Sequence, residues 1–183
     1  MSPAFVRERM IDSGRIHIYM GDGKGKSTAA VGLITRMAGC GGQAVFAQFL
    51  KGDHSGERAA LRMLPHVSVM HVPQQVKFVF QMTPEEKKDY AILQQEFLQE
   101  AFEKAASAQL LVLDEALDAL AMGLIAEETL RALLENRATG LEVVLTGRDA
   151  PKWLQERADY ITRMEKRKHP YDAGVQARRG IEY

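Results

Sequence analysis

A glycine-rich run, GDGKGKST at residues 21–28, carries the residue types that bind a polyphosphate. The common phosphate-binding loop reads G-x-x-x-x-G-K-[ST], but Gly21 lies only four positions before Gly25, so this loop is one residue shorter. Gly21, Gly23 and Gly25 can adopt positive φ without a Cβ penalty, which lets successive N–H groups curl around an anion. We therefore expect a triphosphate cradle made of Gly21, Asp22, Gly23, Lys24, Gly25, Lys26, Ser27 and Thr28.

Two side chains near the end of this loop add charge and a metal ligand. Lys26 supplies a mobile positive charge for the phosphates, and the Ser27 hydroxyl can ligate Mg2+. A helix that propagates from Ser27 adds the positive end of its dipole and its unpaired first-turn N–H groups. The alternative is a glycine-rich turn with two lysines by accident, but the order of strand, loop and helix favours phosphate binding.

The pair Asp114-Glu115 is a second candidate, because it ends the apolar run QLLVL at residues 109–113. P-loop proteins place an acidic strand end beside the metal, and ligands gather at the carboxyl ends of strands in open α/β sheets. Either carboxylate can hold Mg2+ directly or through water, while the other orients a reacting group. The alternative is that both residues only cap a helix that begins at Ala116.

These candidates require strands that end at one edge of a sheet, and the chain alternates strand and helix patterns accordingly. Strands are expected at 15–20, 43–50, 67–72, 109–114, 142–146 and 160–163, and helices at 27–38, 56–64 and 84–106. The pattern predicts an α/β fold of three layers, with a mostly parallel sheet covered on both faces.

The helix at 84–106 has the clearest start, since Thr83 can cap it, Pro84 suits its first position and Glu86 completes a capping box. Its buried stripe is expected to consist of Tyr90, Leu93, Phe97, Ala101 and Lys104.

Composition restricts the partners and the cellular location. The 183 residues contain 24 Lys and Arg against 24 Asp and Glu, so no overall charge favours nucleic acid or an anionic membrane. Cys40 is the only cysteine, which excludes an internal disulfide. The N-terminus lacks the apolar segment of a signal peptide, and no stretch approaches a membrane span. We expect a cytoplasmic protein with an N-terminal arm at 1–14 and a single domain at 15–183.

Five further segments resemble, in this order, the corrinoid adenosyltransferases of the CobA/CobO/BtuR type. They are QFLKG at 48–52, SGER at 55–58, LTGR at 145–148, RAD at 157–159 and KHPYDAGVQARRGIEY at 168–183. The shortened loop is also that family's form, and the resemblance runs from about Ile16 to the last residue.

The resemblance implies transfer of the 5′-deoxyadenosyl group of ATP to the cobalt of a reduced corrinoid, with release of triphosphate. The corrinoid would be cob(I)alamin or cob(I)yrinic acid a,c-diamide, in synthesis or salvage of adenosylcobalamin. A RecA-like P-loop fold, a homodimer, and Mg2+ or a similar divalent ion are implied as well. The reduced cobalt needs an electron donor, for which a flavoprotein is the expected partner.

On the nucleotide side, the resemblance implies that Lys26 neutralises charge on the leaving triphosphate. Ser27 and Glu115 would hold the metal while Asp114 assists. Arg36 falls at a position that the family associates with the nucleotide; the alternative is an exposed helix arginine.

On the corrinoid side, Phe78 and Phe80 match a family segment whose aromatic rings press on the lower face of the corrin and displace its axial ligand. The alternative is that both rings pack into the core. Better-known bacterial members carry Trp at the position of Phe80, and family members commonly carry Gln at the position of Arg178.

Two other functions stay open. A small P-loop kinase or ATPase fits the loop and the acidic pair alone, and it would release ADP, whereas the adenosyltransferase releases triphosphate and an adenosylated corrinoid. A non-catalytic, ATP-gated corrinoid carrier would retain adenosylcorrinoid with negligible turnover. Product analysis separates the three functions.

Overall fold

Six parallel strands form the central sheet of a computed structural model that describes residues 13–52, 55–72 and 77–181. The strands are β1 (Ile16–Met20), β2 (Ala44–Gln48), β3 (Val67–Val69), β4 (Leu110–Asp114), β5 (Glu142–Thr146) and β6 (Tyr160–Arg163). Their order across the sheet is β3-β2-β4-β5-β1-β6, so β5 separates β1 from β4. Every expected strand is present, and all described strand pairs are parallel.

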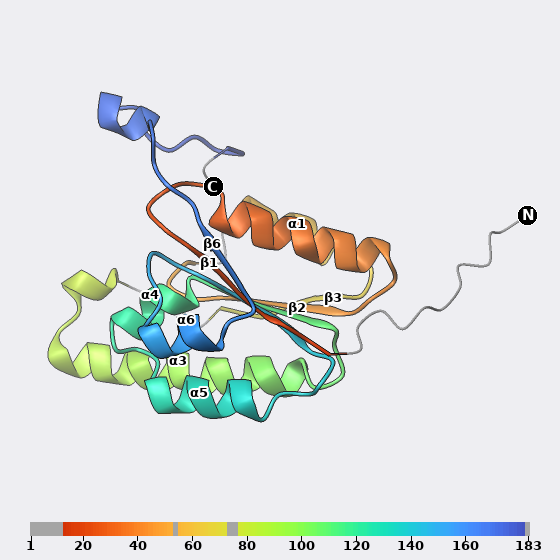
Figure 1. The fold of residues 1–183 in the computed structure, drawn as a ribbon. Helices are drawn as coiled ribbons and strands as arrows, with labels where there is room; N and C mark the ends of the chain where they lie inside the picture. The colour runs from red at the N-terminus through yellow and green to blue at the C-terminus, as the bar shows by residue number, and fades with distance from the viewer. Residues whose placement is uncertain (1–12, 53–54, 73–76, 182–183) are drawn as a thin grey trace, which may run out of the picture.

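Helices cover both faces of this sheet (Figure 1). One face carries α1 (Lys26–Gly39) and α2 (Gly56–Arg62), and the other carries α3 (Pro84–Lys104), α4 (Ala116–Ala121), α5 (Glu127–Glu135) and α6 (Lys152–Arg157). Two short 3-10 turns, η1 (Val79–Gln81) and η2 (Pro170–Ala173), complete the described elements. The expected three-layer α/β architecture with a parallel sheet is thus confirmed.

The two layers of core explain why the central strands are apolar on both sides. All five residues of β2 and of β4 are buried, as expected for strands covered by helices on both faces. Ile34 of α1 and Leu61 of α2 pack with Phe46 on one face, while Phe97 and Leu98 of α3 belong to the core of the other.

The start of α3 is as predicted, whereas its buried stripe is not. The Thr83 hydroxyl accepts from the Glu86 N–H and the Glu86 carboxylate accepts from the Thr83 N–H, with Pro84 in the first turn. The predicted stripe is wrong at Leu93, which is 45% exposed, and at Lys104, which is also exposed. The buried residues are Tyr90, Gln94, Phe97, Leu98, Ala101 and Phe102, because at 100° per residue the buried face centres about a quarter-turn away from Leu93.

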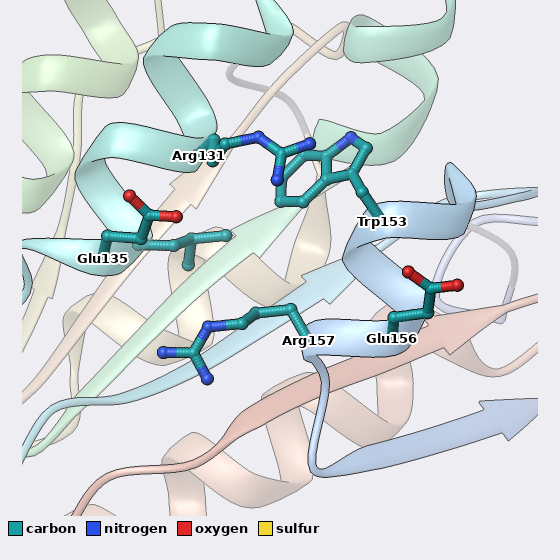
Figure 2. Close-up of a pocket in the computed structure, with 6 residues that line it drawn as sticks. Arg131, Glu135, Trp153, Glu156 and Arg157 are labelled. Carbon is teal, nitrogen blue, oxygen red and sulfur yellow. The ribbon is translucent and has the colours of Figure 1, made fainter.

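On the face of the sheet that also carries α3 and α4, a stacked pair of side chains joins α5 and α6 (Figure 2). The Arg131 guanidinium lies 4.2 Å from the centre of the Trp153 ring, beside a small hollow of about 170 Å³ that Arg157 also lines. None of the predicted site residues lines this hollow.

Most of the expected N-terminal arm falls on residues 1–12, which lie outside the described part, so the division into arm and domain stays a prediction. No helix within the described ranges is both long and apolar enough to cross a membrane.

Candidate active site

The shortened loop follows β1 at the carboxyl edge of the sheet. Gly21 and Gly25 adopt φ of 116° and 107°, as expected for glycine, but Gly23 does not have positive φ. Gly23 is required for a different reason, because a Cβ there would lie 2.7 Å from the carbonyl oxygen of Met164. Gly23 therefore does not use the positive φ that glycine permits, and its small size accommodates the chain that follows β6.

The loop N–H groups divide into two sets. The Gly21 N–H donates to the Arg148 carbonyl at 2.9 Å, and the Gly23 N–H donates to the Met164 carbonyl at 2.7 Å. The exposed Asp22 carboxylate accepts from the Lys166 N–H at 3.1 Å. These three residues fix the loop against neighbouring segments, which leaves the second half of the loop to face a ligand.

That second half lines an open cavity of about 630 Å³, a size typical of small-molecule sites. The walls come from the loop, α1, α2, the segment after β2 and the C-terminal tail. The lining residues are Lys24, Gly25, Lys26, Ser27, Thr28, Val31, Lys51, Gly56, Glu57, Ala60, Glu115, Gly180 and Ile181.

Lys26 folds back over its own loop. Its ammonium donates to the carbonyls of Gly21 and Gly23, each at 2.8 Å. The charge predicted to meet the phosphates is therefore held at the mouth of the loop, where it lines the cavity.

Asp114 and Glu115 close the opposite wall at the end of β4. The Asp114 carboxylate is fully buried, and its two oxygens accept from the Thr146 hydroxyl at 2.7 Å and the Gln48 amide at 2.9 Å. Glu115 adopts φ of 61°, an uncommon conformation for a residue with a side chain, and its N–H donates to the Thr146 hydroxyl at 2.9 Å. Thr146 therefore positions both acidic residues, and only Glu115 lines the cavity.

Lys51 is the cation that faces this acidic pair. Its ammonium lies 3.2 Å from a Glu115 carboxylate oxygen and 3.7 Å from one of Asp114. Burial lowers the pKa of Lys51, but attraction to Asp114 and Glu115 outweighs burial and holds the pKa above its usual value. Burial raises the pKa of Glu115, repulsion by Asp114 and Asp118 adds to that rise, and Lys51 offsets only part of it.

Gln48 extends the network from the end of β2. Its amide also donates to the Glu57 carboxylate at 3.2 Å, and its carbonyl oxygen accepts from the Ser55 hydroxyl at 3.1 Å. Gln48, Lys51 and Thr146 were not predicted as site residues. The available signal was a polar residue at the end of a buried strand, which both Gln48 and Thr146 provide.

The predicted metal ligands suit Mg2+ that arrives with a nucleotide. Within the described residues, no group of three or more His, Cys, Asp or Glu residues could hold a metal. Mg2+ commonly takes one or two protein oxygens and completes its shell with phosphates and water. Ser27 and Glu115 line the cavity, while both Asp114 oxygens already accept hydrogen bonds, so Asp114 is suited to act through water.

A second, apolar hollow of about 320 Å³ is lined by Leu50, the residue before Lys51. Phe78 and Phe80 are 65% and 84% exposed and stack with centroids 5.5 Å apart, so the alternative that they pack into the core is wrong. Leu50, Val79, Lys87 and Met122 complete its lining. Because Leu50 lines this hollow and Lys51 lines the cavity, consecutive residues form the wall between the two.

Two residues singled out in the sequence, Arg36 and Asp159 of the RAD segment, lie away from this cavity. Arg36 is ten residues beyond Lys26 on α1, about 15 Å along the helix, and is not among the residues that line the cavity. In the RAD segment, Asp159 accepts from the Ile16 N–H at 2.9 Å and from Arg15 at 3.2 Å, at the opposite end of β1. Asp159 therefore has a structural contact in the sheet.

Comparison with known proteins gives the family. A profile described as ATP:corrinoid adenosyltransferase BtuR/CobO/CobP matches residues 12–183. The chain belongs to this family. A corrinoid adenosyltransferase of Pseudomonas aeruginosa is 35% identical over 94% of this chain and 85% of its own length, and one of Escherichia coli K12 is 32% identical over 98% and 91%. Among solved structures, the KaiC-like protein PH0186 of Pyrococcus horikoshii OT3 covers 86% of this chain and 75% of its own, with 18% identity and a TM-score of 0.49.

Family membership makes the chain a transferase that uses ATP to adenosylate corrinoids. Three of the segments that carry the resemblance meet at the acidic pair, through Gln48 and Lys51, Ser55 and Glu57, and Thr146. The candidate site is thus assembled from the ends of β2, β4 and β5 and the glycine-rich loop.

Proposed function

We propose that this adenosyltransferase moves the 5′-deoxyadenosyl group of ATP to the Co(I) of a reduced corrinoid. The Co(I) electron pair forms the cobalt–carbon bond, the C5′–O bond breaks, and its electrons leave with triphosphate. The observation that supports this most directly is the shared wall of Leu50 and Lys51 between a charged cavity and an apolar hollow. A nucleotide in the first would present its ribose toward a macrocycle in the second.

The protein's part in this reaction is positioning and charge stabilisation, because Co(I) is itself a strong nucleophile. Lys26 and the helix N-terminus would stabilise the charge that grows on the departing triphosphate. Mg2+ or a similar divalent ion, held by Ser27 and Glu115 with Asp114 assisting, would supply further neutralisation of that charge. None of these groups needs to move a proton.

The length of the loop affects where along it the phosphates can bind. Gly21 and Gly23 use their N–H groups on protein carbonyls, so the groups left for phosphate begin at Lys24. We infer that the phosphate chain sits in a shifted register, with all three phosphoryl groups held as a leaving group. A nucleotide-bound structure with the usual P-loop register would contradict this inference.

Phe78 and Phe80 would contact the lower face of the corrin. Their exposure and near-parallel stacking, with 10° between the planes, support contact with a flat apolar ligand. Rings pressed against that face would displace the axial ligand and make Co(II) easier to reduce. Appearance of four-coordinate Co(II) in the complex with ATP tests this role, and its loss in Phe80→Ala is the expected result.

The assembly proposed is a cytoplasmic homodimer that receives electrons from a flavoprotein. Support for a protein partner comes from β6, an edge strand whose Tyr160 and Ile161 are 54% and 45% exposed. Exposed apolar residues on an open edge commonly mark an association surface. Sedimentation of the purified chain tests the dimer.

The test of the proposed function is anaerobic incubation with ATP, Mg2+ and chemically reduced cobalamin, repeated with reduced cobyrinic acid a,c-diamide. We expect inorganic triphosphate and a light-sensitive cobalt–carbon product. Formation of ADP would favour a kinase or ATPase, and tight retention of adenosylcorrinoid without turnover would favour a carrier. Comparison of the two corrinoids tests whether the chain serves synthesis or salvage.

A further inference from the structure

Lys51 occupies the place where a cation would be expected beside the acidic pair. Its ammonium is 3.2 Å from Glu115 and 3.7 Å from Asp114, and it lines the same cavity as the phosphate loop. Lys26, the other lysine held in place there, is already hydrogen-bonded to Gly21 and Gly23. The two lysines are therefore held at different walls of one cavity, and only Lys51 is paired with carboxylates.

The charges around Lys51 would conflict with an incoming triphosphate if Lys51 were absent. Glu115 and Glu57 line the cavity, and the fully buried Asp114 lies behind its wall within 3.7 Å of the Lys51 ammonium, so three carboxylates contribute negative charge there. A polyanion that enters this space is repelled unless positive charge accompanies it. Unpaired charge at a half-buried site also costs far more than it does in water.

The side chain of Lys51 is suited to change partners. Lysine carries a compact charge on a flexible four-carbon stem, whereas arginine matches carboxylates in a fixed fork. Lys51 follows Leu50, whose φ of 58° fixes the turn of the chain at the boundary between cavity and apolar hollow. The backbone is thus held while the ammonium can swing from the acidic wall toward the loop.

We propose that Lys51 is an exchangeable counter-ion, which holds Asp114 and Glu115 in the nucleotide-free protein and transfers its charge to the triphosphate when metal-bound ATP enters. This inference rests on the proposed function, because it requires a triphosphate in the cavity. The divalent ion replaces Lys51 at Glu115, and repulsion between the two cations favours the swing toward phosphate. Lys51 is on this basis a positioning residue that excludes free metal and admits metal with nucleotide.

The proposal predicts effects of opposite sign on two ligands. Replacing Lys51 with Met keeps most of the unbranched side chain and removes the charge, so Glu115 becomes free to bind a divalent ion. Binding of Mn2+ alone, measured by paramagnetic resonance without nucleotide, should strengthen by roughly tenfold, which is about 1.4 kcal/mol. Binding of ATP alone in chelator, measured by calorimetry, should weaken by a similar factor.

Controls separate this role from a general loss of structure. Lys51→Arg keeps the charge and should leave Mn2+ binding as weak as in the wild type. Lys152→Met removes a lysine from exposed α6, where Lys152 pairs with Glu156 at 3.6 Å, and should change neither ligand. Lys51→Gln repeats the test if the methionine variant fails to fold.

Weaker binding of both ligands in Lys51→Met would overturn the proposal, because that is the effect of a merely structural residue. Unchanged Mn2+ binding would also overturn it, as would unchanged ATP binding. Product analysis of the wild type tests the proposed function independently. If the wild type releases triphosphate but Lys51→Met binds Mn2+ no more tightly, only the role of Lys51 is refuted. If the wild type releases ADP while Lys51→Met binds Mn2+ more tightly, only the proposed function is refuted.

Discussion

At the scale of single residues, Lys26 has the clearest expected effect on rate. Its ammonium is held by the Gly21 and Gly23 carbonyls, in reach of the second half of the loop. We expect Lys26→Ala to lower kcat by about 10² to 10³, the usual effect of removing one preorganised donor to developing negative charge. Single-turnover adenosylation measures it. Unchanged turnover would remove Lys26 from the mechanism.

Thr146 is expected to affect both stability and the site. Thr146→Val removes the hydroxyl that donates to Asp114 and accepts from the Glu115 N–H, leaving buried polar groups without partners. Such a loss costs about 1–3 kcal/mol, or roughly 2–4 °C of Tm per kcal/mol at this size. Urea unfolding measures the loss. Thr146→Ser, which retains the hydroxyl, should behave like the wild type, and equal loss in both variants would contradict this explanation.

The raised pKa of Glu115 predicts a pH dependence of folding stability. A folded-state pKa above the unfolded value favours the protonated form, so the stabilising contribution is present below the unfolded pKa and is lost as pH rises through the folded pKa. At neutral pH the charged Glu115 therefore destabilises the nucleotide-free protein. Glu115→Gln should raise Tm at pH 7, and the gain should shrink toward acid.

The adenosylation rate of Glu115→Gln should fall even though its Tm rises, because the amide cannot replace the Glu115 carboxylate as a metal ligand. Thermal unfolding across pH 4 to 8 and adenosylation at pH 7 measure the two effects. A lower Tm at neutral pH in Glu115→Gln would show that the ion pair with Lys51 outweighs burial.

The residues of the site were predictable to differing degrees. Ser27 and Glu115 line the cavity as expected from the loop pattern and the acidic strand end. The pattern could not predict that the N–H groups of Gly21 and Gly23 are unavailable to a ligand. They donate to the carbonyls of Arg148 and Met164, which lie more than a hundred residues away in the chain. Only the packed structure determines which loop groups remain for phosphate.

At the scale of elements, the capping box of α3 gives a separate stability prediction. Thr83→Ala removes the hydroxyl that accepts from the Glu86 N–H at 3.2 Å, which should cost about 0.5–2 kcal/mol. The same helix carries Lys87, which lines the apolar hollow. Chemical denaturation measures the loss, and Thr83→Ser should restore most of it. No change in Thr83→Ala would mean that packing alone holds the start of α3.

The elements were predictable where local signals agreed. The bounds of β5 and β6 match the expected 142–146 and 160–163, because turn residues flank short β-branched runs. The predicted buried stripe of α3 was wrong at Leu93. The buried face includes Gln94, whose polar side chain suggested that this position faces solvent. Polarity of a single residue does not determine which side of a long helix the tertiary structure covers.

At the scale of the whole molecule, the parallel sheet collects the chemistry at one edge. The ends of β1, β2, β4 and β5 bring together the loop, Gln48, Asp114 and Thr146, which is where open α/β sheets bind ligands. The opposite end holds contacts such as Asp159 with Arg15. A balanced total charge is compatible with polyanion binding because three lysines, Lys24, Lys26 and Lys51, line one cavity.

The sequence patterns did not predict that Gly180 and Ile181 line that cavity. The tail after β6 is exposed and has little regular structure beyond η2, so no periodicity predicts its path. Its position depends on contacts with the loop, such as Lys166 with Asp22.

The central claim is that C5′ of the ribose, rather than phosphorus, is the electrophile in this site. The most direct test uses ATP that carries ¹⁸O in the bridge between C5′ and the α-phosphorus, incubated anaerobically with Mg2+ and reduced cobalamin. Cleavage of the C5′–O bond predicts that all of the label is recovered in inorganic triphosphate and none in the adenosylated corrinoid. Label retained in ADP, with the terminal phosphorus transferred to an acceptor, would contradict the claim.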